Sequence, residues 1–566
     1  MTTPTLSGSD LSASVSLPER STRWDRRGWL TVVGAVLIWS VVQAGTDPTQ
    51  LFNTRGWPQV QAFFSAMVNP DLSRSMVELT IREAAVTVGY ALVGTAVALV
   101  IGTVGGVLLT ERIWRPMHGE MRWGRVGWLI SRFGFVVPRS MHEVVFGLIL
   151  VNILGLDPLV AVLAIGIPFG AVTAKVFAEL IDEVSTTAEV QLRAQGVGRL
   201  TALVVATLPQ AFSDLLSYAF YRFECSLRSA AVLGIVGAGG IGFQLALSFQ
   251  SLRYEEMWTL LWALIIMSGL ADRWSSAVRR RRNAAAAVEM RLNTDDAATG
   301  EEQATRDTGP SETAAPERDR FVRLSAVVCA LAVPIAFWRL DLQISNLWSD
   351  RARTLGGELI EDAWPPQVGR GGFGELAFDS LDTIALAVLS TGLAWAFSSP
   401  ISFLARRPHR VGTGVRGLVR RIGVGAIRFV LLISRSVPPP VWAFVVVFVL
   451  FPGLWPGAVA LAIYNFGVLG RLQSEVLENS DPRPAEILAA TGATSAGAMT
   501  MATVPTIASR FTGLGLYRWE VAIRETVIVG VVGAAGLGRR LDQQASAFNT
   551  TESWPPSLPC WWLPLW

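Results

Sequence analysis

The chain has 566 residues, of which 51% are hydrophobic and only 16% are charged, and its mean hydropathy is +0.41. A water-soluble chain of this length carries more charge, so the composition favours an integral membrane protein in a lipid bilayer. A formal net charge of +3 gives no basis for expecting nucleic acid as a partner, and three cysteines without metal spacing do not predict a disulfide framework.

Apolar runs recur along the chain, and each predicts a membrane helix or part of one, because only helices satisfy the backbone inside lipid. In chain order they cover residues 28–42, 84–109, 144–154, 159–176, 258–270, 324–338, 384–397, 441–451 and 458–468. Arginine clusters at 20–27, 112–125, 279–282 and 406–421 are expected on the cytoplasmic side. Counting the crossings between these clusters predicts six spans in each half. We therefore expect a multi-pass protein of the plasma membrane with its amino terminus in the cytoplasm.

One segment occurs twice at a separation of 296 residues. YRFECSLRSAAVLGIVGAGGIG, residues 221–242, reappears as YRWEVAIRETVIVGVVGAAGLG, residues 517–538. The same offset pairs Arg139 with Arg435 and Gly196 with Gly492 without an insertion. We therefore expect an all-α membrane protein that is a tandem parallel repeat of a six-span unit, with about 11–12 transmembrane helices.

Composition also predicts the boundaries between these units. Residues 1–27 are expected to be a disordered cytoplasmic amino terminus, and residues 274–320, which are polar and rich in small residues, a disordered cytoplasmic linker. The first repeat then covers 28–273 and the second 321–566. Prolines at 555, 556, 559 and 564 oppose a regular helix, so the last span of the second repeat is expected to be degenerate, whether natively or through an altered end of the chain.

The sequence contains no convincing motif for nucleotide binding, metal binding or catalysis by this chain alone. The only lysine lies in GAVTAKV, which lacks the glycine of a phosphate-binding Walker loop, and GAGGIG follows an apolar helix rather than a strand. His118, His142 and His409 are too far apart in the sequence for a metal site. We expect neither an enzyme nor a bound metal or cofactor.

A different motif follows the fourth predicted span of each half. Residues 486–492 read EILAATG and are followed, after nine residues, by ATVP; residues 190–196 read VQLRAQG and are followed by ATLP. This pattern resembles the EAA loop of ABC importer permeases, although in the first half the glutamate is displaced to position 189. The resemblance implies that these loops contact ATPase subunits, one loop each. The coupling residues that the resemblance implies are Glu189, Ala194, Gly196, Pro209, Glu486, Ala490, Gly492 and Pro505.

Within that class, the YRxExxxR segment, the glycine stretch behind it and the Arg-Ser pair of the third span resemble the phosphonate permease family PhnE and its phosphate- and phosphite-handling relatives. The resemblance implies a transmembrane permease that moves a phosphorus oxyanion by alternating access. A separate homodimeric ATPase would bind ATP and Mg²⁺, and an extracytoplasmic binding protein would deliver the anion. An ABC permease for another solute such as methionine, a secondary transporter and, with no supporting site, a membrane enzyme are the alternatives.

Charged residues within the spans are candidates for the substrate path, because charges are costly there. Glu224 with Arg228, and likewise Glu520 with Arg524, are four residues apart and are expected to pair, which leaves Arg222 and Arg518 on another face with a spare charge. Arg139 and Arg435, each followed by a serine, are expected to donate to the anion, unless they extend to the membrane surface. The full set is Arg139, Ser140, Arg222, Glu224, Arg228, Arg435, Ser436, Arg518, Glu520 and Arg524. Gly237, Gly240, Gly242, Gly533, Gly536 and Gly538 are expected at a gate or a tight helix crossing. Helix-packing salt bridges alone would also explain the charges, and packing alone the glycines.

Overall fold

The computed structural model describes residues 23–45, 51–114, 122–299, 320–362, 372–407, 414–530 and 535–546. Within these ranges the secondary structure is helical, apart from one isolated bridge between Phe52 and Leu450, so the expected all-α class is confirmed. The expectations for residues 1–22 and for the last span after residue 546 lie outside the described residues, as does Gly533.

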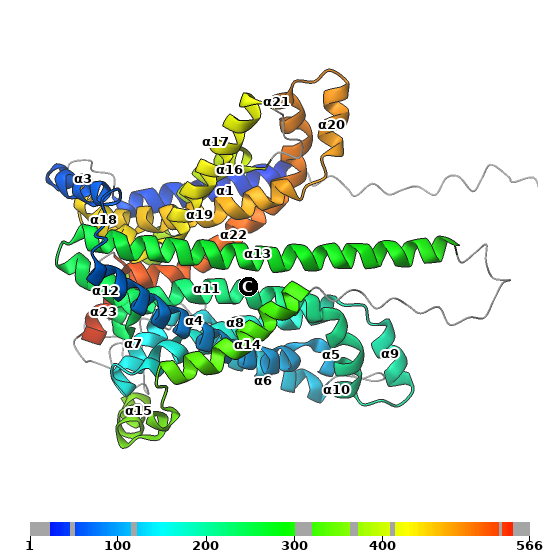
Figure 1. Ribbon diagram of the computed structural model, residues 1–566, viewed down its shortest axis with the longest axis horizontal. Helices are drawn as coiled ribbons and strands as arrows, with labels where there is room; N and C mark the ends of the chain where they lie inside the picture. The colour runs from blue at the N-terminus through cyan, green and yellow to red at the C-terminus, as the bar shows by residue number, and fades with distance from the viewer. Residues whose placement is uncertain are drawn as a thin grey trace, which may run out of the picture.

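The helices repeat with the period of the sequence (Figure 1). The first repeat contains α1 (Arg23–Ala44), α3 (Trp57–Ala66), α4 (Arg74–Leu109), α5 (Glu111–Trp114), α6 (Arg122–Ser140), α7 (Glu143–Leu154), α8 (Pro158–Glu183), α9 (Thr187–Ala194), α10 (Arg199–Ala202), α11 (Leu208–Leu233), α12 (Gly240–Gln250) and α13 (Tyr254–Thr299). The second contains α14 (Arg320–Arg339), α15 (Asp350–Asp362), α16 (Gly372–Ala405), α17 (Val415–Ser436), α18 (Pro439–Val449), α19 (Leu454–Glu478), α20 (Arg483–Ala490), α21 (Ser495–Ala498), α22 (Val504–Gly530) and α23 (Leu537–Ser546). Because α9 and α10 return as α20 and α21 with bounds shifted by 296 residues, the duplication extends to individual helix ends.

Five helices in the described ranges are long and apolar enough to cross a membrane by themselves, and two bent pairs raise that number to seven. The five are Arg74–Leu109, Pro158–Glu183, Arg199–Ala238, Arg320–Arg339 and Gly372–Ala405. Helices α13, α19 and α22 run beside these but do not reach the same combination of high hydropathy and low charge (Figure 1). Length and composition thus recover fewer than the six spans per half that we expected.

Each bent pair corresponds to the third predicted span of its repeat. Helices α6 and α7 meet at 85°, and α17 and α18 meet at 95°. Pro438 to Pro440 explain the second bend, since prolines cannot continue the hydrogen-bond ladder of α17 and are well suited to begin α18. The bends place the carboxyl ends of α6 and α17 inside the molecule.

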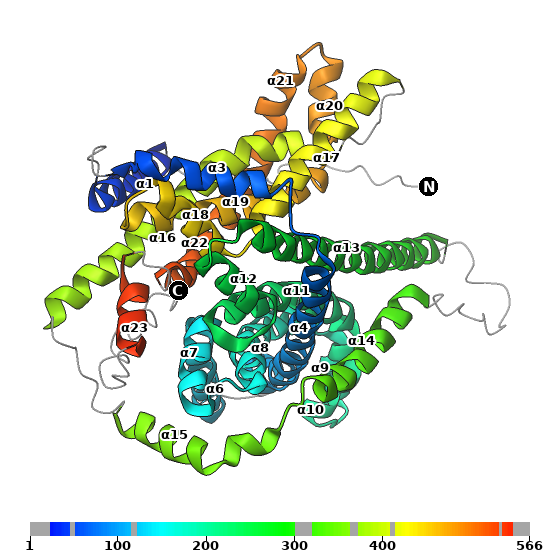
Figure 2. The ribbon, with the colours of Figure 1, turned by 60° about the vertical axis from the view of Figure 1, so that its left-hand side comes forward.

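The repeats exchange their first helices. Helix α1 packs on α16 of the second repeat, where the side-chain amide of Gln43 donates to Asp382 at 2.8 Å, and α14 packs on α4 of the first repeat. Figure 2 shows α1 among the helices of the second repeat and α14 across the first. Each repeat therefore depends on the other to cover its apolar surface.

Small residues let α4 and α8 approach closely. A Cβ atom on Gly102 would lie 2.4 Å from the Thr173 side chain, and one on Gly105 would lie 2.5 Å from the Ala174 side chain. Small residues at such crossings are the usual means by which membrane helices gain packing contacts. Helix α11 packs against both helices of this pair.

The segment expected to be a disordered linker is partly helical. Helix α13 continues to Thr299, through the cluster of arginines after Val278. Residues 274–299 are therefore described as helix where the sequence predicted disorder, and their alanine and arginine content supports a helix that extends an existing one. Residues 300–319 lie outside the described ranges.

Candidate functional site

A cavity of about 140 Å³ lies between the two repeats. It is lined by α7, α8 and α11 of the first repeat and by α17, α19 and α22 of the second, together with the two bends. Five of the arginines predicted for the substrate path line it, whereas only two glutamates, Glu143 and Glu525, do so among the described residues. Ser436 lines it as well. The five arginines are Arg222, Arg228, Arg435, Arg518 and Arg524. A buried space with this excess of positive charge is suited to an anion.

Arg222 has the surroundings that the sequence predicted. Its guanidinium lies 4.6 Å from the ring centre of Phe169 and 5.3 Å from that of Tyr218, and it donates to the Tyr218 hydroxyl. Among the described residues, no carboxylate lies within 4.0 Å of it, and its Nε has no hydrogen-bond partner. Aromatic faces stabilise a cation without neutralising it, so Arg222 keeps its charge in the cavity wall.

Its repeat mate Arg518 does not have a spare charge, contrary to the prediction. The Nη2 atom of Arg518 lies 2.8 Å from Oε2 of Glu525, and it also donates to the side-chain oxygen of Asn465. The sequence argument considered only partners four residues away, whereas Glu525 is seven residues away, two helical turns along the same face. The predicted equivalence of the two arginines is therefore wrong.

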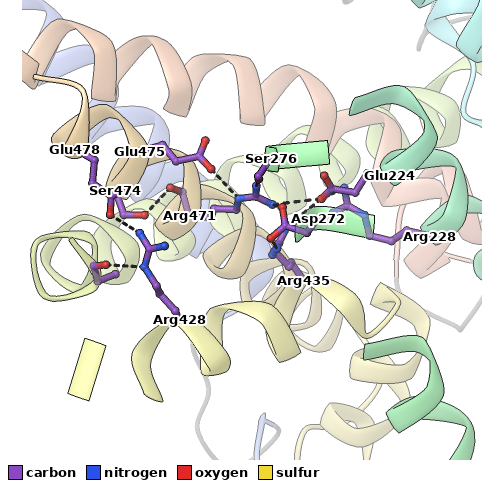
Figure 3. A network of polar contacts seen from close by, with 11 residues as sticks. Glu224, Arg228, Asp272, Ser276, Arg428, Arg435, Arg471, Ser474, Glu475 and Glu478 are labelled. Carbon is purple, nitrogen blue, oxygen red and sulfur yellow. Dashed lines mark hydrogen bonds and ion pairs between the residues drawn. The ribbon is translucent and has the colours of Figure 1, made fainter. Parts of the chain in front are cut away.

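Glu224 pairs with Arg228 as expected, at 3.8 Å, but this is the longest of its ion pairs. Glu224 also receives Arg435 at 3.1 Å and Arg471 at 3.4 Å, both from the second repeat (Figure 3). Arg435 is only 7% exposed, so it does not extend to the membrane surface. Its charge is shared within the chain, which corrects its prediction as a free anion ligand.

The same network continues away from the cavity. Asp272 of α13 accepts from Arg435 at 3.0 Å and also pairs with Arg471, which in turn lies 2.9 Å from Glu475 (Figure 3). These contacts join α11 and α13 of the first repeat to α17 and α19 of the second. Buried charges require such partners, so the network holds the two repeats together at this edge of the cavity.

Two further predictions about charged residues need correction. Glu520 and Arg524 form no ion pair within the described residues; Arg524 instead donates to the backbone oxygen of Arg139 at 3.1 Å. Arg139 and Ser140 do not line the cavity, and the Ser140 hydroxyl donates to the oxygen of Val137. Their counterparts Arg435 and Ser436 do line it.

In each repeat the glycine stretch forms a turn that separates two helices, α11 from α12 and α22 from α23. Gly240 has φ of +72° and Gly536 has φ of +94°, and a Cβ on either would lie within 2.8 Å of a threonine hydroxyl. Those hydroxyls, on Thr87 and Thr383, accept from the backbone N–H of Ile241 and Leu537, both at 3.0 Å. The glycines thus permit a backbone conformation and a close approach that other residues would strain, which is the packing interpretation. Gly237, with φ of +109°, and Gly242 and Gly538, which contact the preceding helix, belong to the same turns.

The two EAA-like loops have the predicted helix–turn–helix form and lie at the same end of the molecule (Figure 1). Gly196 has φ of +87° and Gly492 has φ of +92°, and each ends a short helix in the left-handed conformation that favours glycine. Pro209 and Pro505 are the second residues of α11 and α22, as expected of prolines that open a span. Ala194, Glu486 and Ala490 are exposed on these loops.

Glu189 differs from the other loop residues because it is buried. Its Oε2 accepts from Arg112 at 3.0 Å and from the Thr207 hydroxyl at 3.1 Å, and Arg193 lies 3.6 Å from its other oxygen. Glu189 thus links α9 to α5 and to the residue that directly precedes α11. The structure therefore gives it a role inside the loop and none at the loop surface.

Sequence reasoning missed several residues of the site. Glu525 and Asn465 could have been found by comparing the two copies, since they stand where the first repeat has Ser229 and Phe169. Asp272 lies at the end of the predicted first repeat, beyond the apolar run 258–270, so nothing in the sequence indicated that it is an ion-pair partner inside the molecule. Arg471 was also missed; its counterpart at the 296-residue offset is Lys175, which lies 3.7 Å from Glu179.

Two membrane repeats around a shared cavity, each with a glycine-turn loop at the same end, define a membrane permease. The chain matches the model of the family described as "binding-protein-dependent transport system inner membrane component" over residues 117–272 and again over 415–562. The matched residues make up more than half of the chain. This protein therefore belongs to that family of transport permeases and carries its domain twice.

Relatives with assigned names agree with this family. The chain is 28% identical to the phosphate-import permease protein PhnE of Mycolicibacterium smegmatis over 427 residues, which are 74% of this chain and 72% of the relative. It is 31% identical to the phosphite transport system permease protein PtxC of Stutzerimonas stutzeri, over 45% of this chain and 90% of that one. It is 33% identical to the putative cryptic phosphonate transport system permease protein PhnE2 of Escherichia coli K12, over 21% of this chain and 97% of the relative.

A solved structure of the MetNI methionine ABC transporter, in inward-facing conformations, aligns with 37% of this chain and 99% of the matched chain at 22% identity. The TM-score is 0.32, and a likeness this loose adds nothing to the assignment made from the sequence family.

Proposed function

We propose that this protein is the transmembrane subunit of an ATP-driven importer for a phosphorus oxyanion, that is phosphonate, phosphate or phosphite. The two repeats act as the two halves of one pore, and the anion passes through the cavity between them. Relatives whose names state phosphate, phosphite or phosphonate transport support the substrate class.

The cavity itself carries this proposal. Five arginines converge on a space of about 140 Å³, and a cavity near 150 Å³ accommodates a molecule as large as benzene, so an anion with five or six heavy atoms fits. Arginine presents a planar fork of donors that matches the oxygens of phosphate-like groups. A pore for methionine, which is neutral overall, would not need this excess of positive charge.

Partners follow from the loops at one end of the molecule. We infer that α9 with α10 and α20 with α21 each dock on one subunit of a homodimeric ATPase, which supplies ATP and Mg²⁺ binding, while a binding protein delivers the anion from outside the cell. This orientation places the loops and the amino terminus in the cytoplasm of a plasma-membrane protein, in agreement with the arginine clusters. Closure of the ATPase then moves the two repeats relative to each other and alternates access to the cavity.

Reconstitution tests this function. The chain, a partner ATPase and a binding protein are placed in proteoliposomes with ATP, and uptake of radiolabelled phosphate, methylphosphonate, phosphite and methionine is measured. We expect ATP-dependent uptake of at least one phosphorus anion and none of methionine. Uptake of methionine alone, or uptake of a phosphorus anion driven by an ion gradient without the ATPase, would overturn the proposal.

A further inference from the structure

The two repeats are not equivalent where they face the cavity. We propose that the cavity binds one tetrahedral oxyanion on the side of the first repeat, at Arg222, and that Glu525 is the specificity-determining residue that keeps Arg518 from serving as a second site. In the proposed function, on which this inference rests for its ligand, the oxyanion is the transported phosphorus anion.

The first observation is the state of the two arginines. Both are buried, at 8% exposed for Arg222 and 6% for Arg518, and the Nε atom of each lacks a partner within the described residues. They differ in charge balance, because Arg518 has the carboxylate of Glu525 at 2.8 Å and Arg222 has only aromatic rings and a phenol. A buried cation without a counter-ion is costly, so an anion in the cavity gains more by contacting Arg222 than by contacting Arg518.

The second observation is that two substitutions between the copies produce this difference. At the 296-residue offset, Ser229 stands where the second repeat has Glu525, seven residues after the arginine in both cases. Phe169 stands where the second repeat has Asn465. The first repeat thus offers Arg222 a ring, whereas the second offers Arg518 both an amide oxygen and a carboxylate.

The third observation is that the acid of the first repeat is directed elsewhere. Glu143 also lines the cavity, but its Oε1 accepts from the Ser229 hydroxyl at 2.5 Å and its Oε2 lies 3.2 Å from His142. The serine that replaces Glu525 in the first copy therefore fixes Glu143 through a hydrogen bond. Arg222 is left as the cavity arginine without an ion pair in the described ranges on the first-repeat helices, since Arg228 pairs with Glu224.

The duplicated sequence supplies its own matched variants. Arg222→Gln and Arg518→Gln remove the two repeat mates, while Ser229→Glu and Glu525→Ser exchange the residues seven positions later. Equilibrium binding of radiolabelled inorganic phosphate to the full chain in lipid nanodiscs is measured for each, with methylphosphonate, phosphite and sulfate as competitors. Thermal unfolding without ligand and elution as a single species check that each variant is folded, and Arg222→Lys keeps the charge if Arg222→Gln does not fold.

We expect Arg222→Gln to weaken phosphate binding by about tenfold or more, the scale of a lost charge-assisted hydrogen bond, and Arg518→Gln to change it by about twofold or less. Ser229→Glu should weaken it as much as Arg222→Gln, because it supplies Arg222 with a carboxylate. Glu525→Ser should strengthen it by about threefold or more, because it frees Arg518.

Equal losses of phosphate affinity in Arg222→Gln and Arg518→Gln would overturn the asymmetric site. It would also be overturned if none of the four anions binds. Unchanged affinity in Glu525→Ser would overturn the role of Glu525. These failures are separate from failure of the proposed function. If only sulfate binds, and more weakly to Arg222→Gln than to Arg518→Gln, the asymmetric site is supported and phosphorus transport is contradicted. If the proteoliposomes take up phosphate but the two variants lose affinity equally, transport is supported and the asymmetric site is contradicted.

Discussion

Arg435 and Glu224 form an ion pair at 3.1 Å across the two repeats, with Arg435 at the end of α17 and Glu224 in the middle of α11. The pair lies beside the cavity, and it is reinforced by Asp272 and Arg471 (Figure 3). Any motion that separates the repeats at this edge must break it. The network therefore links the state of the cavity to the relative position of the two halves.

Glu224→Gln should destabilise the protein strongly, because it removes the carboxylate shared by Arg228, Arg435 and Arg471. Loss of one partner from a buried ion pair costs about 3–5 kcal/mol, whereas Glu520→Gln, at a position without an ion pair within the described residues, should cost less than about 1 kcal/mol. Thermal unfolding of the two purified variants in the same detergent measures the difference. Equal stability of the two would show that the network contributes nothing to folding.

The exchange of first helices predicts which cysteine pairs cross-link. A Cβ on Gly392 would lie 2.9 Å from the Leu37 side chain, so Leu37→Cys with Gly392→Cys should form a disulfide in a background without the native cysteines. Leu37→Cys with Ala96→Cys, which is the equivalent position of the first repeat, should stay reduced. After cleavage at a protease site inserted between residues 300 and 319, the first pair should hold the two halves together on a non-reducing gel. Linkage through Ala96→Cys instead would contradict the exchange.

The loop glycines should be required for coupling. Gly492→Ala and Gly196→Ala each force a side chain into a left-handed conformation, at a cost of about 1–2 kcal/mol confined to the loop. ATP-dependent uptake should fall while the amount of membrane-inserted protein stays the same. Gly513→Ala is the control, since this helical glycine has open space around it and no positive φ. Normal uptake by a variant carrying both loop substitutions would show that the turns do not contribute to coupling.

The threonines behind the glycine turns should behave alike, unlike the arginines. Thr87→Ala and Thr383→Ala each remove one hydroxyl that accepts a backbone N–H at 3.0 Å, and each should cost about 1–2 kcal/mol. Unfolding temperatures of the two variants should therefore shift by similar amounts. A shift confined to one of them would show that the two turns are not mechanically equivalent.

One chain should form one pore. Because each repeat supplies the helix that covers the other, a second copy is not needed to complete either half. Native mass spectrometry of the complex with its ATPase should find one copy of this chain for two ATPase subunits. Two copies of this chain in the complex would contradict the fused-dimer arrangement.

The sequence by itself determined the membrane class, the duplication and the loop geometry. These features are local or periodic: apolar runs predict helices in lipid, Gly196 and Gly492 predict left-handed turns, and a constant offset predicts matching helix ends. Arg222 was predicted to lie on another helix face than Glu224, and within the described residues no carboxylate lies within 4.0 Å of it.

Only the tertiary structure decided which charges are neutralised and which helices cover each repeat. Arg435 finds Glu224 across 211 residues of sequence, and Arg518 finds Glu525 two turns away, so neither pairing follows from the four-residue spacing of a single helix face. The exchange of α1 and α14 likewise depends on where apolar faces meet after both repeats have folded. Physically, the sequence predicts elements through local backbone preferences, whereas counter-ions in a buried cavity are set by packing between elements.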